Sequence, residues 1–204
     1  MEKVVKQVLL FMGVFCFGLV GGSGQGVLQI TFDGPPTQPS GAQYGATSYS
    51  EAGMLFTPID TTTPGSQLTR NGGGIPGYPD DGSAYVQSGG GLLFGFDNGA
   101  LFGLNSVSLA GYSTVAPDFS VDFVGFLANG NIITTTFSGN GIDFQTFQFG
   151  SQWTGLASVE VLDSPWSLDN LVVAVPEPKE ITLLMIGTAF LYCCRRKRFQ
   201  EKIR

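Results

Sequence analysis

The chain has 204 residues, and its thirty glycines, eleven prolines and 12% aromatic residues are typical of one domain of short strands and turns rather than of long helices. Between residues 25 and 178 the only basic residue is Arg70, while thirteen acidic residues give this stretch a net charge of −12 (thirteen negative, one positive). Because phosphate backbones need lysine or arginine for neutralisation, this charge excludes nucleic acid as a partner.

The first predicted element is a secretion signal over residues 1–24. Lys3 and Lys6 precede an apolar run over residues 8–20, and small residues follow as far as Gly24. A basic start, an apolar stretch and then small residues describe a signal peptide that is cleaved near its end. The alternative is an N-terminal anchor helix that is not cleaved.

The stretch 25–174 predicts one all-β domain, because short alternating segments recur along it between Gly, Pro, Asn and Asp. The clearest hairpin covers 119–137, where Asn129-Gly130 favours a type I′ turn. Regular spacing favours an antiparallel β-sandwich or jelly roll over βαβ units, with 35–50 and 58–82 as loops. The expected strands are 27–33, 54–56, 84–87, 92–96, 106–110, 119–127, 132–137, 144–149, 156–162 and 168–173.

Residues 175–204 form a tail with three parts: a Pro-Glu-Pro motif preceded by valine, an apolar run over 181–194, and a basic cluster. As a helix the apolar run rises about 21 Å, against a hydrocarbon core of about 30 Å, so it is short for a permanent anchor. The positive-inside rule places the basic cluster in the cytoplasm and the domain outside. The motif is Val175, Pro176, Glu177 and Pro178, and the cluster is Arg195, Arg196, Lys197 and Arg198.

In the order of these parts, the tail resembles the PEP-CTERM sorting signal. The resemblance implies recognition by an exosortase, a membrane processing enzyme, and attachment to the membrane through the short helix. Substrates of that family are linked to exopolysaccharide and biofilm matrix. The resemblance therefore implies an exported protein at the cell surface or, once processed, in the extracellular matrix. The alternative is a chance Pro-Glu-Pro sequence before an ordinary anchor.

The domain itself offers few residues for catalysis. The chain has no histidine, and Cys16, Cys193 and Cys194 lie in the terminal segments. The domain therefore cannot form a disulfide, a Cys/His zinc site, a cysteine nucleophile or a His-dependent triad. Asp118 and Asp122 face the same side of a predicted strand, but about 13 Å apart, which is too far for a retaining glycosidase pair.

The order of strands also resembles extracellular β-sandwich domains that precede such tails, through 102–107, 119–137 and 168–173. These domains look like the jelly-roll folds of lectins and carbohydrate-binding modules. We therefore expect a non-enzymatic protein that is structural or glycan-binding in an exopolysaccharide matrix. The alternative is a secreted polysaccharide-acting enzyme on a jelly-roll fold.

One metal site is predicted from the two ends of the domain. Asp33 ends the first predicted strand, and Asp169-Asn170 opens the last. Terminal strands of a jelly roll commonly lie near each other, so Asp33, Asp169 and Asn170 would offer oxygen ligands to a structural calcium ion. The likeness to carbohydrate-binding modules implies such an ion. The alternative is that these residues form strand-end Asx turns.

Aromatic residues beside turns are the predicted ligand-binding positions. Trp153, Trp166 and Tyr78 would offer ring faces on which sugars stack. The alternative is that these rings belong to the hydrophobic core, as large aromatic side chains commonly do. The nearby sequence Pro79-Asp80-Asp81-Gly82 is interpreted as a turn, since it lacks the spacing of a dedicated calcium loop.

Overall fold

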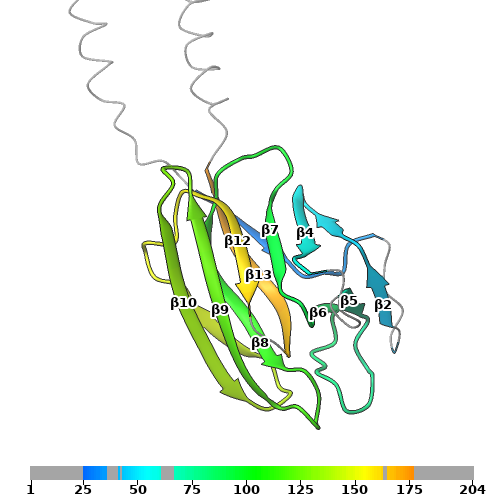
Figure 1. The fold of residues 1–204 in the computed structure, drawn as a ribbon. Coiled ribbons are helices and arrows are strands. Elements are labelled where there is room, and N and C mark those ends of the chain that lie inside the picture. Colours follow the sequence, from blue (N-terminus) through cyan, green and yellow to red (C-terminus); the bar gives the residue numbers. More distant parts are fainter. Residues whose placement is uncertain (1–24, 36–40, 42, 61–66, 163–164, 177–204) are drawn as a thin grey trace, which may run out of the picture. The chain divides into compact units, whose positions relative to one another are not determined.

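The structure, a computed structural model, describes residues 25–35, 41, 43–60, 67–162 and 165–176. All regular secondary structure in these ranges is β-strand (Figure 1). Within them there is no helix of sufficient length and hydrophobicity to cross a membrane. The predicted signal segment, membrane helix and basic cluster lie outside the described residues, as do Glu177 and Pro178 of the motif. The stretch Gly26–Val175 forms one compact unit.

The strands form two sheets in which neighbours along each path run antiparallel, so the predicted all-β antiparallel sandwich is confirmed. Sheet A has the order β11-β8-β13-β6-β5-β2, with β1 also paired to β13, and sheet B has the order β10-β9-β12-β7-β4-β3. The bounds in sheet A are β1 Gln25–Ile30, β2 Gln43–Ala46, β5 Leu68–Asn71, β6 Tyr85–Ser88, β8 Gly103–Gly111, β11 Gln145–Gln148 and β13 Trp166–Pro176. Those in sheet B are β3 Tyr49–Glu51, β4 Met54–Pro58, β7 Leu92–Phe96, β9 Asp118–Leu127, β10 Ile132–Asn140 and β12 Leu156–Leu162.

One hydrophobic core lies between the two sheets. Alternate residues of β9 enter it, so that Val121 and Phe123 are fully buried while Asp122 between them is not. Aromatic rings continue the core across the sandwich: Phe56 contacts both Phe32 and Phe94, with ring centroids 5.2 and 5.4 Å apart. Each fully buried phenylalanine stabilises the fold by about 1.5–3 kcal/mol relative to an exposed one.

The hairpin of β9 and β10 is confirmed, but the prediction of its turn type is wrong. The strands pair without a break in register. Gly130 has a φ of 85°, whereas Asn129 is not in the left-handed region. A type I′ turn needs positive φ at both central residues. The loop is held instead by the Gly130 N–H, which donates to the Leu127 carbonyl at 2.9 Å, and by the Asn131 N–H, which donates to Asn129 Oδ1 at 3.0 Å.

Three short strands, β2, β3 and β5, lie in stretches that the sequence predicts as loops. In β5 the polar sequence hides the pattern, because Leu68 and Arg70 are the buried alternate pair and one of them is charged. The first strand ends at Ile30 rather than at Asp33, because Phe32 adopts a left-handed φ of 58°. That bend still buries the Phe32 ring completely.

Candidate functional site

A group of polar side chains is buried on the outer face of sheet A. On β13 the core residue Leu168 is followed by Asp169, which by strand alternation faces away from the core. Asp169 is nevertheless 0% exposed. Side chains and backbone from two loops, 72–84 and 111–117, contact this face. We call Tyr78, Tyr85, Tyr112, Asp81 and Asp169, which gather there, the tyrosine–aspartate cluster.

Hydrogen bonds anchor the second loop to the sheet. The Gln87 side-chain amide donates to the Tyr112 carbonyl at 2.8 Å and to Ser167 Oγ at 2.7 Å. Ser167 Oγ in turn donates to the Gly111 carbonyl at 3.1 Å, and Asn71 Nδ2 donates to Gln87 Oε1 at 2.8 Å. Asn71, Gln87 and Ser167 are at most 1% exposed. Side chains from strands β5, β6 and β13 therefore act together to fix the position of the Tyr112 backbone.

Asp81 and Asp169 are joined through Ser83 and Asn170. The Ser83 hydroxyl lies 2.7 Å from Asp169 Oδ2 and 2.6 Å from Asp81 Oδ1. The Asn170 side-chain amide donates to Asp169 Oδ2 at 3.1 Å and to Asp81 Oδ2 at 3.2 Å. The Asn170 backbone N–H also donates to Asp169 Oδ1 at 2.6 Å. Two carboxyl groups from distant parts of the chain thus share the same two neighbours.

The environment of Asp169 favours its protonated form. Burial raises the pKa of Asp169 to about 9, and a hydrogen bond to Asp81 and the charge of Asp81 act in the same direction. The hydrogen bonds from Ser83 and from the Asn170 backbone oppose this shift. Asp169 therefore carries a proton at neutral pH and can donate it in a hydrogen bond to Asp81.

The predicted calcium ligands come together only in part. Asn170 sits at an irregularity in the pairing of β13 with β8, with a φ of 47°, and its Oδ1 accepts from Gln29 Nε2 at 2.6 Å. Asp33 Oδ1 instead accepts from the Ala84 N–H at 2.8 Å. Among the described residues, no three His, Cys, Asp or Glu side chains gather to hold a metal ion.

Asp169 and Asn170 thus lie together while Asp33 holds the Ala84 N–H, and the calcium site remains a prediction. The loop before β6 forms the turn that the sequence Pro79-Asp80-Asp81-Gly82 predicts. The Gly82 N–H donates to Asp80 Oδ1 and the Ser83 N–H to Asp81 Oδ1, both at 3.1 Å, which confirms the predicted turn. No local pattern in the sequence predicts that Asn170 Nδ2 also donates to Asp81 Oδ2.

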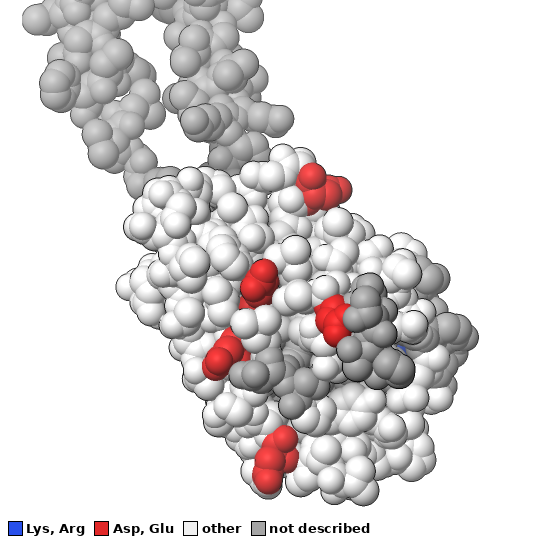
Figure 2. Space-filling model, in the orientation of Figure 1, with Lys and Arg blue, Asp and Glu red and all other residues white. Residues whose placement is uncertain are grey.

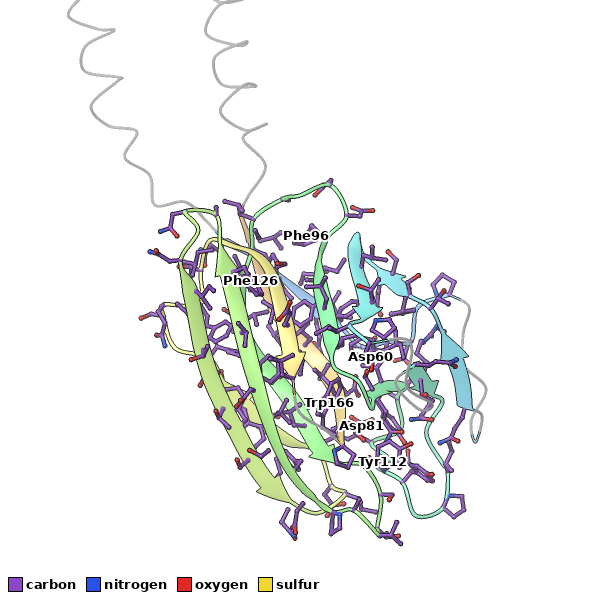
Figure 3. The ribbon with its side chains drawn as sticks, viewed as in Figure 1. Asp60, Asp81, Phe96, Tyr112, Phe126 and Trp166 are labelled. Atoms are coloured by element: carbon purple, nitrogen blue, oxygen red, sulfur yellow. The ribbon has the colours of Figure 1, made fainter. Side chains whose placement is uncertain are left out.

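Three tyrosines form the aromatic part of the cluster. Tyr78 and Tyr112 are half-buried and meet edge to face, with ring centroids 5.8 Å apart. Tyr85 is fully buried against Phe144, with ring centroids 5.5 Å apart, and its hydroxyl has no hydrogen-bond partner among the residues that the structure describes. Burial raises the pKa of Tyr85, and the neighbouring Tyr78 and Asp80 add to the shift. Figure 3 shows Tyr112 and Asp81 at the same end of the domain.

The prediction that both tryptophans are exposed stacking platforms is wrong. Trp153 is 1% and Trp166 0% exposed. The Trp153 ring packs on Phe149, with centroids 4.9 Å apart, and fills the space beside Gly125, where a Cβ atom would lie 2.9 Å from the ring. The alternative, that these rings belong to the core, is correct for both. Of the three predicted stacking residues, Tyr78 alone keeps part of its ring at the surface.

Comparisons with known proteins show general likeness only. No family model matches the chain, and no curated protein matches it. Discoidin II of Dictyostelium discoideum is similar at 16% identity and a TM-score of 0.32, over 44% of this chain and 38% of that one. The CBM22-1–GH10 modules of Clostridium thermocellum xylanase 10B, solved with xylohexaose, are similar at 10% identity and a TM-score of 0.30, over 74% of this chain and 28% of that one. The chain thus spans well under half the length of either protein.

Proposed function

We propose that this chain is an exported, non-enzymatic protein of the cell surface or extracellular matrix, sorted through its PEP-CTERM tail. The observation that carries the proposal is the distribution of positive charge. Arg70, the only basic residue between 25 and 178, is 3% exposed. On the face that Figure 2 shows, acidic side chains are scattered and almost no basic side chain is visible. All other basic residues flank the two apolar runs, where export machinery reads them.

The end of the domain suits processing. Strand β13 runs to Pro176, so the motif begins within the last strand of the sheet. Each proline of the motif disfavours helical backbone at the residue before it, which favours an extended conformation of the motif. A processing enzyme binds its substrate most readily as extended backbone. Because the motif lies at the end of the last strand, cleavage there would release the domain whole.

Mass spectrometry of the protein purified from its native host tests the sorting. We expect a mature N-terminus near residue 25 and a C-terminus close to Pro178, because both predicted signals would be removed. Replacing Pro176, Glu177 and Pro178 with alanine should leave the C-terminal segment attached while the N-terminus is still processed. Recovery of residues 1–204 intact from the wild-type host would rule out the processing.

The cluster supports glycan binding as the activity of the domain. The partly buried Tyr78 ring, which packs edge to face on Tyr112, would offer an apolar face to the C–H groups of a sugar. Asp81 and Asn170 beside it are hydrogen-bonding groups near the surface. A protein surface that binds a sugar ring combines a small number of apolar faces with several polar groups.

Replacement of Tyr78 tests this site. In native gels that contain the host exopolysaccharide, the wild-type protein should be retarded, and Tyr78→Ala should weaken binding roughly tenfold through loss of stacking. Tyr78→Phe keeps the ring and should bind within about threefold of the wild type. If no polysaccharide retards the wild-type protein, glycan binding fails and the structural role remains.

One observation favours the enzymatic alternative. Asp81 and Asp169 are two carboxyl groups bridged by Ser83 and Asn170, and the raised pKa of Asp169 is a property shared by catalytic acids. Against it stands the burial of Asp169, which is 0% exposed and so does not reach a substrate in this conformation. Assays for new reducing ends in the same polysaccharide samples decide between the two: the proposal expects none, with the wild type and with Asp169→Asn alike.

A further inference from the structure

The strands at the margins of the two sheets differ greatly in length, and β1, which joins sheet A only through β13, has six residues. Sheet A ends in β11 and β2, of four residues each, and sheet B ends in β3, of three residues, and β10, of nine. Very short edge strands are a common protection against pairing with other chains. Strands β2, β3 and β11 have this protection, whereas β10, the longest strand at a margin and visible along one side of the domain in Figure 1, does not.

Strand β10 also lacks the other features that block an edge. Residues 132–140 contain no charged residue and no proline. Their register with β9 is continuous, with no bulge to turn the edge away. In the described part of the chain, no backbone hydrogen bond outside the β9 ladder involves residues 132–139, and only the Asn140 carbonyl is capped, by Gln145 Nε2 at 2.9 Å. One side of the β10 backbone is therefore free to pair.

Charge identifies a second copy of this chain as the partner. The domain is strongly acidic, so two copies repel each other wherever their carboxylates meet. Along β10 only neutral side chains would meet. The nearest carboxylates, Asp118 and Asp122, lie one strand back on β9, and Asn140 and Thr136 donate to them there. A free basic strand of another protein would find no complementary charge on this edge.

The sequence of β10 also suits pairing with itself. Antiparallel pairing about a twofold axis at Thr136 places Thr134 of one copy opposite Ser138 of the other. Cross-strand pairs of threonine and serine are favourable on a sheet surface. The neighbouring edge strand β11, residues 145–148, is uncharged as well, and it lies on the same flank because Phe147 contacts Phe137 of β10 at 4.9 Å. No carboxylate of either strand would oppose the approach.

We propose that β10 pairs antiparallel with β10 of a second copy, which joins the two six-stranded B sheets into one continuous sheet. The dimer leaves the tyrosine–aspartate cluster on the outer face of sheet A uncovered, so two copies would present two such sites. It depends on the free edge alone and stands whether or not the domain binds glycan.

The test compares Lys substitutions on the two edges of sheet B. The mature protein isolated from its host is analysed by sedimentation velocity across a concentration series. The wild type should show a monomer–dimer equilibrium. Thr136→Lys sets two ammonium groups opposite each other at the twofold axis and should raise the dimer dissociation constant at least about tenfold. Ser50→Lys, on the short edge strand β3, should leave it within about twofold.

Hydrogen exchange provides a second measurement that does not need a variant. Backbone amides within 132–139 should exchange more slowly as wild-type protein concentration rises, while those of β3 do not change. A wild-type protein that stays monomeric, or a Thr136→Lys protein that folds and dimerises as the wild type does, would overturn the proposal. A circular dichroism melt of Thr136→Lys distinguishes loss of pairing from loss of folding.

Discussion

Replacing Arg70 with alanine is expected to lower the free energy of unfolding by about 3–5 kcal/mol, measured by urea denaturation. Arg70 Nη2 donates to the Phe32 carbonyl at 2.7 Å and to the Gly34 carbonyl at 2.8 Å. Its guanidinium lies 4.1 Å from the centre of the Tyr49 ring. Without it, two carbonyl groups lose their donor and the partly buried Glu51 side chain loses the only nearby positive charge in the domain.

This effect is large because Arg70 fixes the bend that ends β1. Phe32 adopts its left-handed φ only where surrounding contacts hold it, and both carbonyls on either side of Asp33 are held by one guanidinium. Arg70→Lys should recover part of the loss, because an ammonium keeps the charge but not the planar fork. A loss below about 0.5 kcal/mol for Arg70→Ala would contradict this role.

The free energy of unfolding is expected to fall as pH rises, across the range in which folded Asp169 is protonated and an unfolded aspartate is ionised. The unfolded residue titrates near 3.8 and the folded one at about 9. Between these values the folded protein holds one proton more, so its contribution to the free energy of unfolding decreases by about 1.4 kcal/mol for each pH unit. This contribution is complete below pH 3.8 and lost as pH passes 9.

The variant Asp169→Asn isolates this contribution, because it keeps a donor toward Asp81 and removes the titration. The difference in unfolding free energy between wild type and variant should therefore change sign in favour of the variant at alkaline pH. Asp143→Asn makes the same substitution at an exposed position and should follow the wild-type curve. Parallel curves for wild type and Asp169→Asn between pH 4 and pH 9, or a large stabilisation of the wild type by calcium, would contradict a protonated Asp169.

The longer strands could be predicted from the sequence because one face of each is apolar. In β9 Phe119, Val121 and Phe123 alternate with Ser120 and Asp122, and the structure buries the apolar face. Strands β2 and β5 could not be predicted in this way. They have four residues each, and the second hides a charged residue among its buried positions. These strands form because they pair with segments far along the chain, and a local sequence pattern does not show which segments will pair.

The candidate site was predictable only residue by residue. Asp169, Asn170 and Tyr78 could be named from the sequence, since polar residues at strand ends and aromatics in loops commonly serve binding. Alternation tells which face of a strand a residue occupies, but not which loop covers that face. The meeting of Asp81 with Asn170 and of Tyr112 with Tyr78 depends on such covering loops. The prediction that the tryptophans are exposed was wrong for the same reason, since a position beside a turn does not determine whether a side chain is buried.

Display of the domain outside the cytoplasm is the claim on which the rest depends, and protease treatment of intact host cells measures it most directly. The account predicts that protease added outside removes the 25–174 region from whole cells as completely as from lysed cells, while a cytoplasmic marker survives in the intact sample. Full protection of this region in intact cells, together with digestion after lysis, would contradict it.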